Sequence, residues 1–141
     1  MKTIFIIFFS LVATSLFSQD AIPTQNGRKS KFTNSYKYYR IVTDNSDTNW
    51  LTLKNEFTFN VGRNYNIKMT DAFGRSETYI CRGETEEFIY GNKKGWKNYY
   101  ALANIGNFEF NILRAGLIIK KADLIAVYTN VPSFFPDDFF Y

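Results

Sequence analysis

The stretch LTLKNEFTFNV, residues 51–61, decides the fold that the sequence predicts. Apolar residues stand at every second position on both sides of Asn55, and polar residues stand between them. Successive side chains of a β-strand point to opposite faces, so this alternation gives one apolar and one polar face. The pattern predicts one long strand, or two short ones if Asn55 interrupts it.

The same period of two extends outward from this stretch, back to Tyr36 and forward through Tyr65, Ile67 and Met69. Turn-forming residues separate further strand candidates, which lie at residues 77–82, 86–90, 96–103, 108–113, 117–120 and 124–129. Short strands about ten residues apart are typical of an antiparallel sandwich or small barrel. The sequence therefore predicts an all-β or mainly β domain with about 7–9 short strands. The last two candidates could instead form one helix, although their isoleucine and valine content favours strands.

The first 18 residues are predicted to be a cleavable export signal. Lys2 precedes residues 4–17, which are largely apolar and carry no charge. As a helix this segment spans about 21 Å, too short for the ~30 Å hydrocarbon core of a membrane. Cleavage after Ser18 would leave Gln19 first and no transmembrane helix. We expect the mature protein in the periplasm, at the cell surface or in the medium.

Composition supports a single domain after the signal. Residues 19–35 are polar without a clear period and predict a flexible lead-in, so the β-rich domain is expected at residues 36–141. The formal net charge of +4 is only mildly basic. The cations at residues 28–31 lack interleaved aromatics, which favours a solvated tail, and we expect no nucleic-acid partner.

The residues available for chemistry point away from catalysis. The chain has no histidine, which removes the commonest general base and metal ligand. Cys81, the single cysteine, can form no internal disulfide and is expected to be a buried structural residue. Glu84, Glu86 and Glu87 could supply a hydrolase carboxylate pair, but a solvated turn is the favoured interpretation. We expect no cofactor, and these residues favour a non-catalytic protein while leaving an enzyme open.

The polar segment at residues 44–49, DNSDTN, has some likeness to a calcium loop. Such a loop needs glycine at its sixth position and glutamate at its twelfth, where this chain has Asn49 and Asn55. A turn closed by local side-chain hydrogen bonds is the simpler interpretation. The sequence therefore predicts no metal site.

Two segments combine aromatic and basic residues, YKYYR at 36–40 and KKGWKNYY at 93–100. Rings with polar tips suit peptide or sugar surfaces, although filling of the core is the favoured interpretation of these rings. The candidate binding residues are Tyr36, Tyr38, Arg40, Lys94, Trp96 and Tyr99.

The segment SFFPDDFFY, residues 133–141, is expected to cap an open end of the fold or to dock on a partner, and capping is favoured. Its terminal aromatics resemble the assembly signal of outer-membrane barrels. Most strand candidates, however, are shorter than the ~9–11 residues of a membrane-spanning strand.

Together these features predict an exported, non-catalytic binding or adaptor domain that contacts an envelope or extracellular protein or glycan. The alternatives are a carboxylate-dependent hydrolase and a stoichiometric inhibitor or immunity-type protein.

Overall fold

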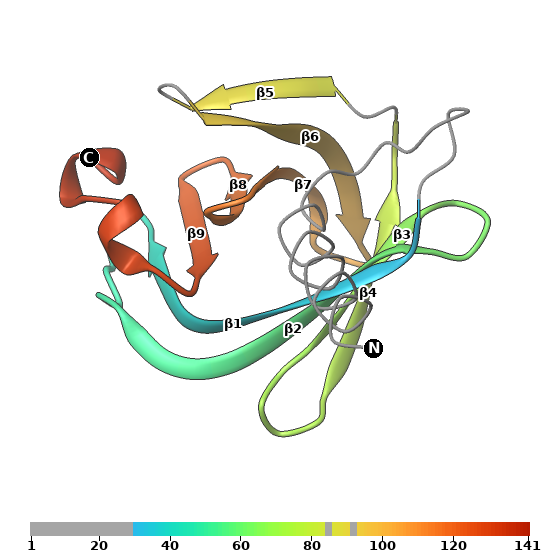
Figure 1. Ribbon diagram of the computed structural model, residues 1–141, viewed down its shortest axis with the longest axis horizontal. Coiled ribbons are helices and arrows are strands. Elements are labelled where there is room, and N and C mark those ends of the chain that lie inside the picture. The colour runs from blue at the N-terminus through green and yellow to red at the C-terminus, as the bar shows by residue number, and fades with distance from the viewer. Residues whose placement is uncertain (1–29, 84–85, 91–92) are drawn as a thin grey trace, which may run out of the picture.

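The computed structural model describes residues 30–83, 86–90 and 93–141, so the predicted export signal lies outside the described residues. Within these ranges nine strands form one antiparallel sheet (Figure 1). The strands are β1 (Phe32–Val42), β2 (Leu51–Val61), β3 (Asn66–Thr70), β4 (Ser76–Cys81), β5 (Glu86–Tyr90), β6 (Lys93–Leu102), β7 (Gly106–Leu113), β8 (Gly116–Lys121) and β9 (Leu124–Thr129).

The sheet closes into a barrel, which settles the choice between sandwich and barrel. Each strand pairs with its neighbour in the chain except that β4 pairs with β6, and β1 pairs with β9. Strand β5 is additional and pairs with the first half of β6. Strands β8 and β9 are separate, so the alternative of one helix is excluded. Strand β1 begins at Phe32, four residues before the predicted start of the β-rich part.

The barrel interior is a packed aromatic core. Phe57 and Phe110 are fully buried, and their ring centroids lie 4.9 Å from Tyr128 and Tyr100, respectively. Tyr79 lies 5.0 Å from Phe110. Aromatic pairs at these separations contribute about 0.5–1.5 kcal/mol beyond area burial. The rings pack there together with buried aliphatic side chains, among them Ile67, Ile112 and Leu117.

The C-terminal strap, residues 132–141, covers the outer wall of the barrel rather than an open end. It contains two short 3-10 turns, η2 (Pro132–Phe134) and η3 (Asp137–Phe139), and lies beside β1 and β9 (Figure 1). Phe135 and Phe140 are buried in a second cluster with apolar side chains of the wall, which are Val42, Leu113, Ile118 and Val127. The strap thus buries outward-facing apolar residues of four strands, so it covers the barrel wall and not the open end that the sequence led us to expect.

Arg40 joins the strap to the wall. Arg40 is 3 % exposed, and its guanidinium donates two bonds to Asp47 at 3.0 and 2.7 Å and a third to Asp137 at 2.8 Å. It also lies 4.3 Å from the ring centroid of Phe140. The hydrogen bonds from Arg40 lower the pKa of Asp47 well below its ordinary value, with Tyr141 and the Asn49 amide adding to the effect. One buried cation therefore ties β1, the 43–50 loop and the strap together.

We expect Asp47→Asn to lower the melting temperature by several degrees, and Asp137→Asn to lower it less. Asp47 provides two of the three bonds to a buried charge, whereas the Asp137 side chain is 84 % exposed and water can replace it. Because the folded-state pKa of Asp47 is depressed, its contribution is present above the unfolded pKa of about 3.9 and is lost as pH falls through the folded value. Thermal unfolding at neutral and acid pH checks both points. Equal effects of the two substitutions would contradict this role for Asp47.

Candidate functional site

The two predicted aromatic–basic segments lie on opposite sides of the barrel. The first is on β1 and the second is on β6, and three strands separate β1 from β6 by either route around the barrel. They therefore cannot form one continuous outer surface.

On β1 two of the predicted binding residues are buried. Tyr36 is 5 % exposed and its ring fills the barrel interior against Phe57. Arg40 is buried beneath the strap, and Tyr38 is half-buried. The predicted contact residues at 36–40 therefore do not share one exposed surface, because the Tyr36 ring lies in the core and the Arg40 guanidinium is bonded beneath the strap.

On β6 the predicted residues divide between the two faces of the wall. Trp96 is half-buried and packs against the interior core. Lys94 is exposed, forms an ion pair with Glu87 at 3.2 Å, and lies 6.0 Å from the Trp96 ring centroid. Tyr99 is 45 % exposed on the outer face. Of the six predicted residues, only Tyr99 lines the groove described next.

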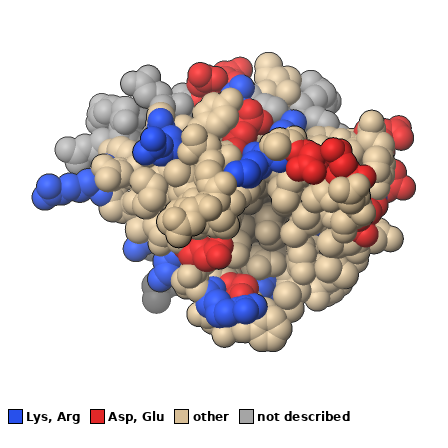
Figure 2. Space-filling view, turned by 180° about the vertical axis from the view of Figure 1, so that it is seen from behind, with Lys and Arg blue, Asp and Glu red and all other residues tan. Residues whose placement is uncertain are grey.

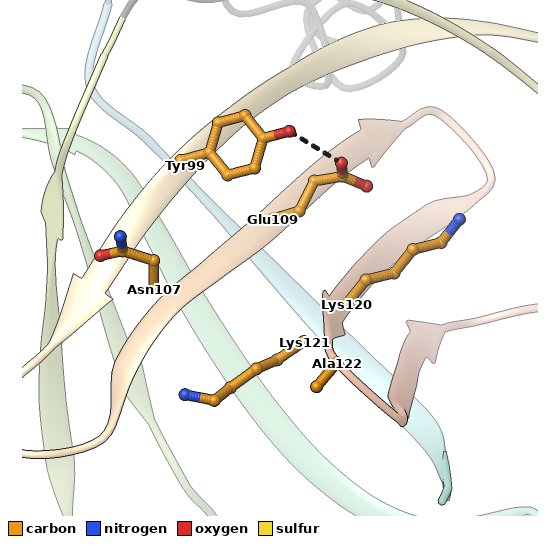
Figure 3. Close-up of a pocket in the computed structure, with 6 residues that line it drawn as sticks. All are labelled: Tyr99, Asn107, Glu109, Lys120, Lys121 and Ala122. Atoms are coloured by element: carbon orange, nitrogen blue, oxygen red, sulfur yellow. Dashed lines mark hydrogen bonds between the residues drawn. The ribbon is translucent and has the colours of Figure 1, made fainter.

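The outer groove is a shallow hollow of about 390 Å³ on the outside of β6, β7 and β8 (Figure 3). In the sheet register Tyr99 lies opposite Glu109, and Glu109 lies opposite Lys120. These side chains therefore stand next to one another across three strands. The complete lining is Tyr99, Asn107, Glu109, Lys120, Lys121 and Ala122.

Two hydrogen bonds fix Glu109 in the groove. The Tyr99 hydroxyl donates to Oε1 at 3.2 Å (Figure 3), and Nδ2 of Asn111 donates to Oε2 at 2.9 Å. Asn111 has no exposed surface, so it holds the carboxylate from beneath the outer surface. The exposed Tyr99 ring and the Glu109 carboxylate consequently restrain each other on rigid strands, as a preorganised site requires.

The two lysines of the groove differ in what they contact. Lys121 donates to the carbonyl of Ile105, and its Nζ lies 5.1 Å from the ring centroid of Phe108. Lys120 makes no ion pair within the described residues, and its amino group points away from Glu109 (Figure 3). Lys120 is thus the cation that a ligand in the groove can recruit.

Asn107, Glu109 and Lys120 were not among the predicted binding residues, because they lie 8 to 21 residues from Tyr99 along the chain. A signal for two of them was present. Glu109 and Lys120 are polar residues inside the predicted strands 108–113 and 117–120. To predict that they lie beside Tyr99, one must know the register in which the strands pair. Alternation within one strand does not determine that register.

The glutamates that could form a hydrolase pair do not come together in a site within the described structure. Glu86 and Glu87 are exposed, and they form ion pairs with Lys97 at 3.7 Å and Lys94 at 3.2 Å across the β5–β6 pair. Consecutive strand residues point to opposite faces, so these two carboxylates diverge. Glu84 lies outside the described residues.

The 44–49 segment is a turn, as predicted. The amide of Thr48 donates to the Ile41 carbonyl, and the amide of Asn49 donates to the Asp47 carboxylate. Among the described residues there is no group of three or more cysteine, aspartate or glutamate side chains placed to hold a metal ion.

Cys81 is half-buried and packs against the interior core. Its thiol donates to the Gly83 carbonyl at 3.3 Å and accepts from Nδ2 of Asn98 at 3.5 Å. These contacts give the cysteine a packing role at the β4–β6 closure.

Charge is distributed in small groups on the face seen in Figure 2. Lysine and arginine side chains alternate there with aspartate and glutamate side chains over a mostly uncharged surface, so this face has no broad region of one sign. In the described ranges, no helix combines the length and apolar character needed to cross a membrane.

The fold and the groove define the class of molecule. It is a small closed β-barrel with a packed aromatic interior, a strap on its outer wall and a polar groove on another part of that wall. Comparisons of the chain with models of protein families, with curated proteins and with solved structures find no match.

Proposed function

We propose that this chain is an exported, non-catalytic binding domain that contacts an envelope or extracellular ligand through the outer groove. The observation that carries the proposal is the exposed ring of Tyr99, held by its hydrogen bond to Glu109 in a hollow of about 390 Å³. The volume of this hollow lies within the range of about 300–1,000 Å³ that is common for ligand sites. Export is inferred from residues 1–18, whose basic start, short apolar run and small residues are those of a signal peptide.

The chemistry of the groove favours binding over catalysis. Its lining contains one carboxylate, Glu109, whose two oxygens already accept hydrogen bonds. Hydrolysis by paired carboxylates needs a second one about 5–9.5 Å away. The lining supplies no other carboxylate, and the chain has no histidine to act as the base in its place. What the groove does offer is a flat ring, an acceptor, an amide and an ammonium group, which are the groups of a recognition surface.

We expect groove substitutions to abolish capture of the natural ligand from the envelope fraction of producing cells. Tyr99→Ala removes the exposed ring and Lys120→Ala removes the unpaired cation, so each should reduce the retained ligand at least tenfold, which corresponds to about 1.4 kcal/mol. Quantitative affinity capture with the immobilised chain measures this.

The matched controls lie away from the groove. Lys54→Ala changes an exposed lysine on β2, the strand opposite β7 in the barrel, and Phe73→Ala changes an aromatic ring that is 72 % exposed. Both controls should retain the ligand as the wild type does. Equal retention by all four variants would show that the outer groove is not the contact surface.

A further inference from the structure

The outer groove combines a flat apolar surface with hydrogen-bonding groups of both kinds. The Tyr99 ring supplies the flat surface, and it is 45 % exposed. Glu109 supplies acceptors, Asn107 supplies a donor and an acceptor, and Lys120 supplies donors only. A ligand that fits this set must present an apolar face together with groups that both donate and accept.

The acceptors in the groove have capacity left for a ligand. An ionised carboxylate offers about four lone-pair sites, and Glu109 uses one on each oxygen for Tyr99 and Asn111. The Tyr99 hydroxyl donates its proton to Glu109, so its own oxygen remains free to accept. A ligand with neighbouring hydroxyl groups fits these acceptors, because each hydroxyl can both donate and accept a hydrogen bond.

Other ligand classes fit the groove less well. An extended peptide adds to an unpaired strand edge, but β7, at the floor of the groove, is paired on both edges. A compact anion would meet the Glu109 carboxylate, and the Lys121 ammonium is already bonded to the Ile105 carbonyl. A metal ion would find one carboxylate among the lining residues.

We propose that the outer groove binds a carbohydrate, with a sugar ring stacked on Tyr99 and adjacent hydroxyls donating to Glu109 and exchanging hydrogen bonds with Asn107. This inference rests on the proposed function and names the ligand class of the same site. Lys120 donates to a ring substituent at the open side of the groove. Strand β7, at the floor of the groove, is hydrogen-bonded to β6 and β8 along its two edges. Recognition of the sugar therefore uses side chains alone.

The experiment titrates the purified chain, followed by amide NMR, with defined cello-, malto-, xylo- and chito-oligosaccharides, oligogalacturonides, and the glycan fraction of the producing cells' envelope. At least one of these should shift the amides of residues 99, 107, 109 and 120. Tyr99→Ala should weaken that binding at least tenfold. Tyr99→Phe keeps the ring but loses the hydroxyl, with its bond to Glu109 and its free acceptor, so it should weaken binding less than Tyr99→Ala. Glu109→Gln should also weaken it, and Lys54→Ala should leave it unchanged.

The outcomes separate this inference from the proposed function. If none of these glycans binds while a protein from the envelope is captured only when Tyr99 is intact, the carbohydrate inference is overturned and the groove remains the contact surface. If a glycan binds but no groove substitution changes its affinity, the inference is overturned as well. If the binding of neither a glycan nor a protein changes when Tyr99 or Lys120 is substituted, both the carbohydrate inference and the proposed function are overturned.

Discussion

Raising the pH from about 9 to about 12 is expected to unfold the barrel in one cooperative step. Tyr79, Tyr100 and Tyr128 all lie in the interior core, where burial disfavours the charged phenolate. Burial, with a smaller contribution from Glu77, raises the pKa of Tyr79 to about 12. Burial raises the pKa of Tyr100 and Tyr128 further above the ordinary value of 10.0.

The sign follows from proton binding in the two states. Because the folded-state pKa of each tyrosine is raised, its contribution to stability is fully present below the unfolded value of about 10. It is lost as pH rises toward the folded value, by up to about 1.4 kcal/mol per pH unit for each group. Three such groups together approach the whole stability of a typical domain, about 5–15 kcal/mol, within about two units.

Circular dichroism and tyrosinate absorbance, recorded together during an alkaline titration, test this expectation. The buried tyrosines should ionise only as the structure is lost, so the two signals should change together. Tyr128→Phe should move the midpoint to higher pH, whereas Tyr99→Phe, at an exposed ring, should not. Ionisation of the core tyrosines in a folded barrel would contradict the packed interior.

Phe57→Ala is expected to lower the free energy of unfolding by about 3–5 kcal/mol. The Phe57 ring has no exposed surface, and it lies 4.9 Å from Tyr128, 5.9 Å from Tyr36 and 6.3 Å from Phe59 between ring centroids. Rings held by several neighbours in a closed barrel cannot collapse into the vacated space, so a cavity adds to the lost transfer free energy.

The matched control is Phe73→Ala, which removes the same atoms from a ring that is 72 % exposed. It should change the free energy of unfolding by no more than about 0.5 kcal/mol. Denaturant titration with a common m-value measures both variants. A Phe57→Ala protein as stable as the control would mean that the core is loosely packed.

Local alternation in the sequence was sufficient to predict the strands. Residues 51–61 alternate because one face of β2 packs inside the barrel, and the structure shows one continuous strand there. Asn55, at the interruption, is buried and donates to the carbonyl of Leu53. Its polar group is therefore satisfied within the strand, and the strand need not break.

Alternation was not sufficient to predict which side chains face inward on β1. The register shifts between Tyr36 and Tyr38, and such a bulge inserts an extra residue into the pattern. Tyr36 and then Tyr39 consequently pack on the interior core, while Arg40 points to the outer wall. An aromatic–basic segment that looks like one surface in the sequence is divided by the bulge between core and exterior.

By itself the sequence determined the strands, the aromatic interior and the turn at residues 44–49, because each depends on neighbours a few positions away. Only the tertiary structure decided that the barrel closes, that Arg40 is buried by a strap about ninety residues later, and that Tyr99, Glu109 and Lys120 share a groove. The physical reason is register: which residues of β6, β7 and β8 stand side by side is fixed by the closure of the whole sheet. No single strand contains that information.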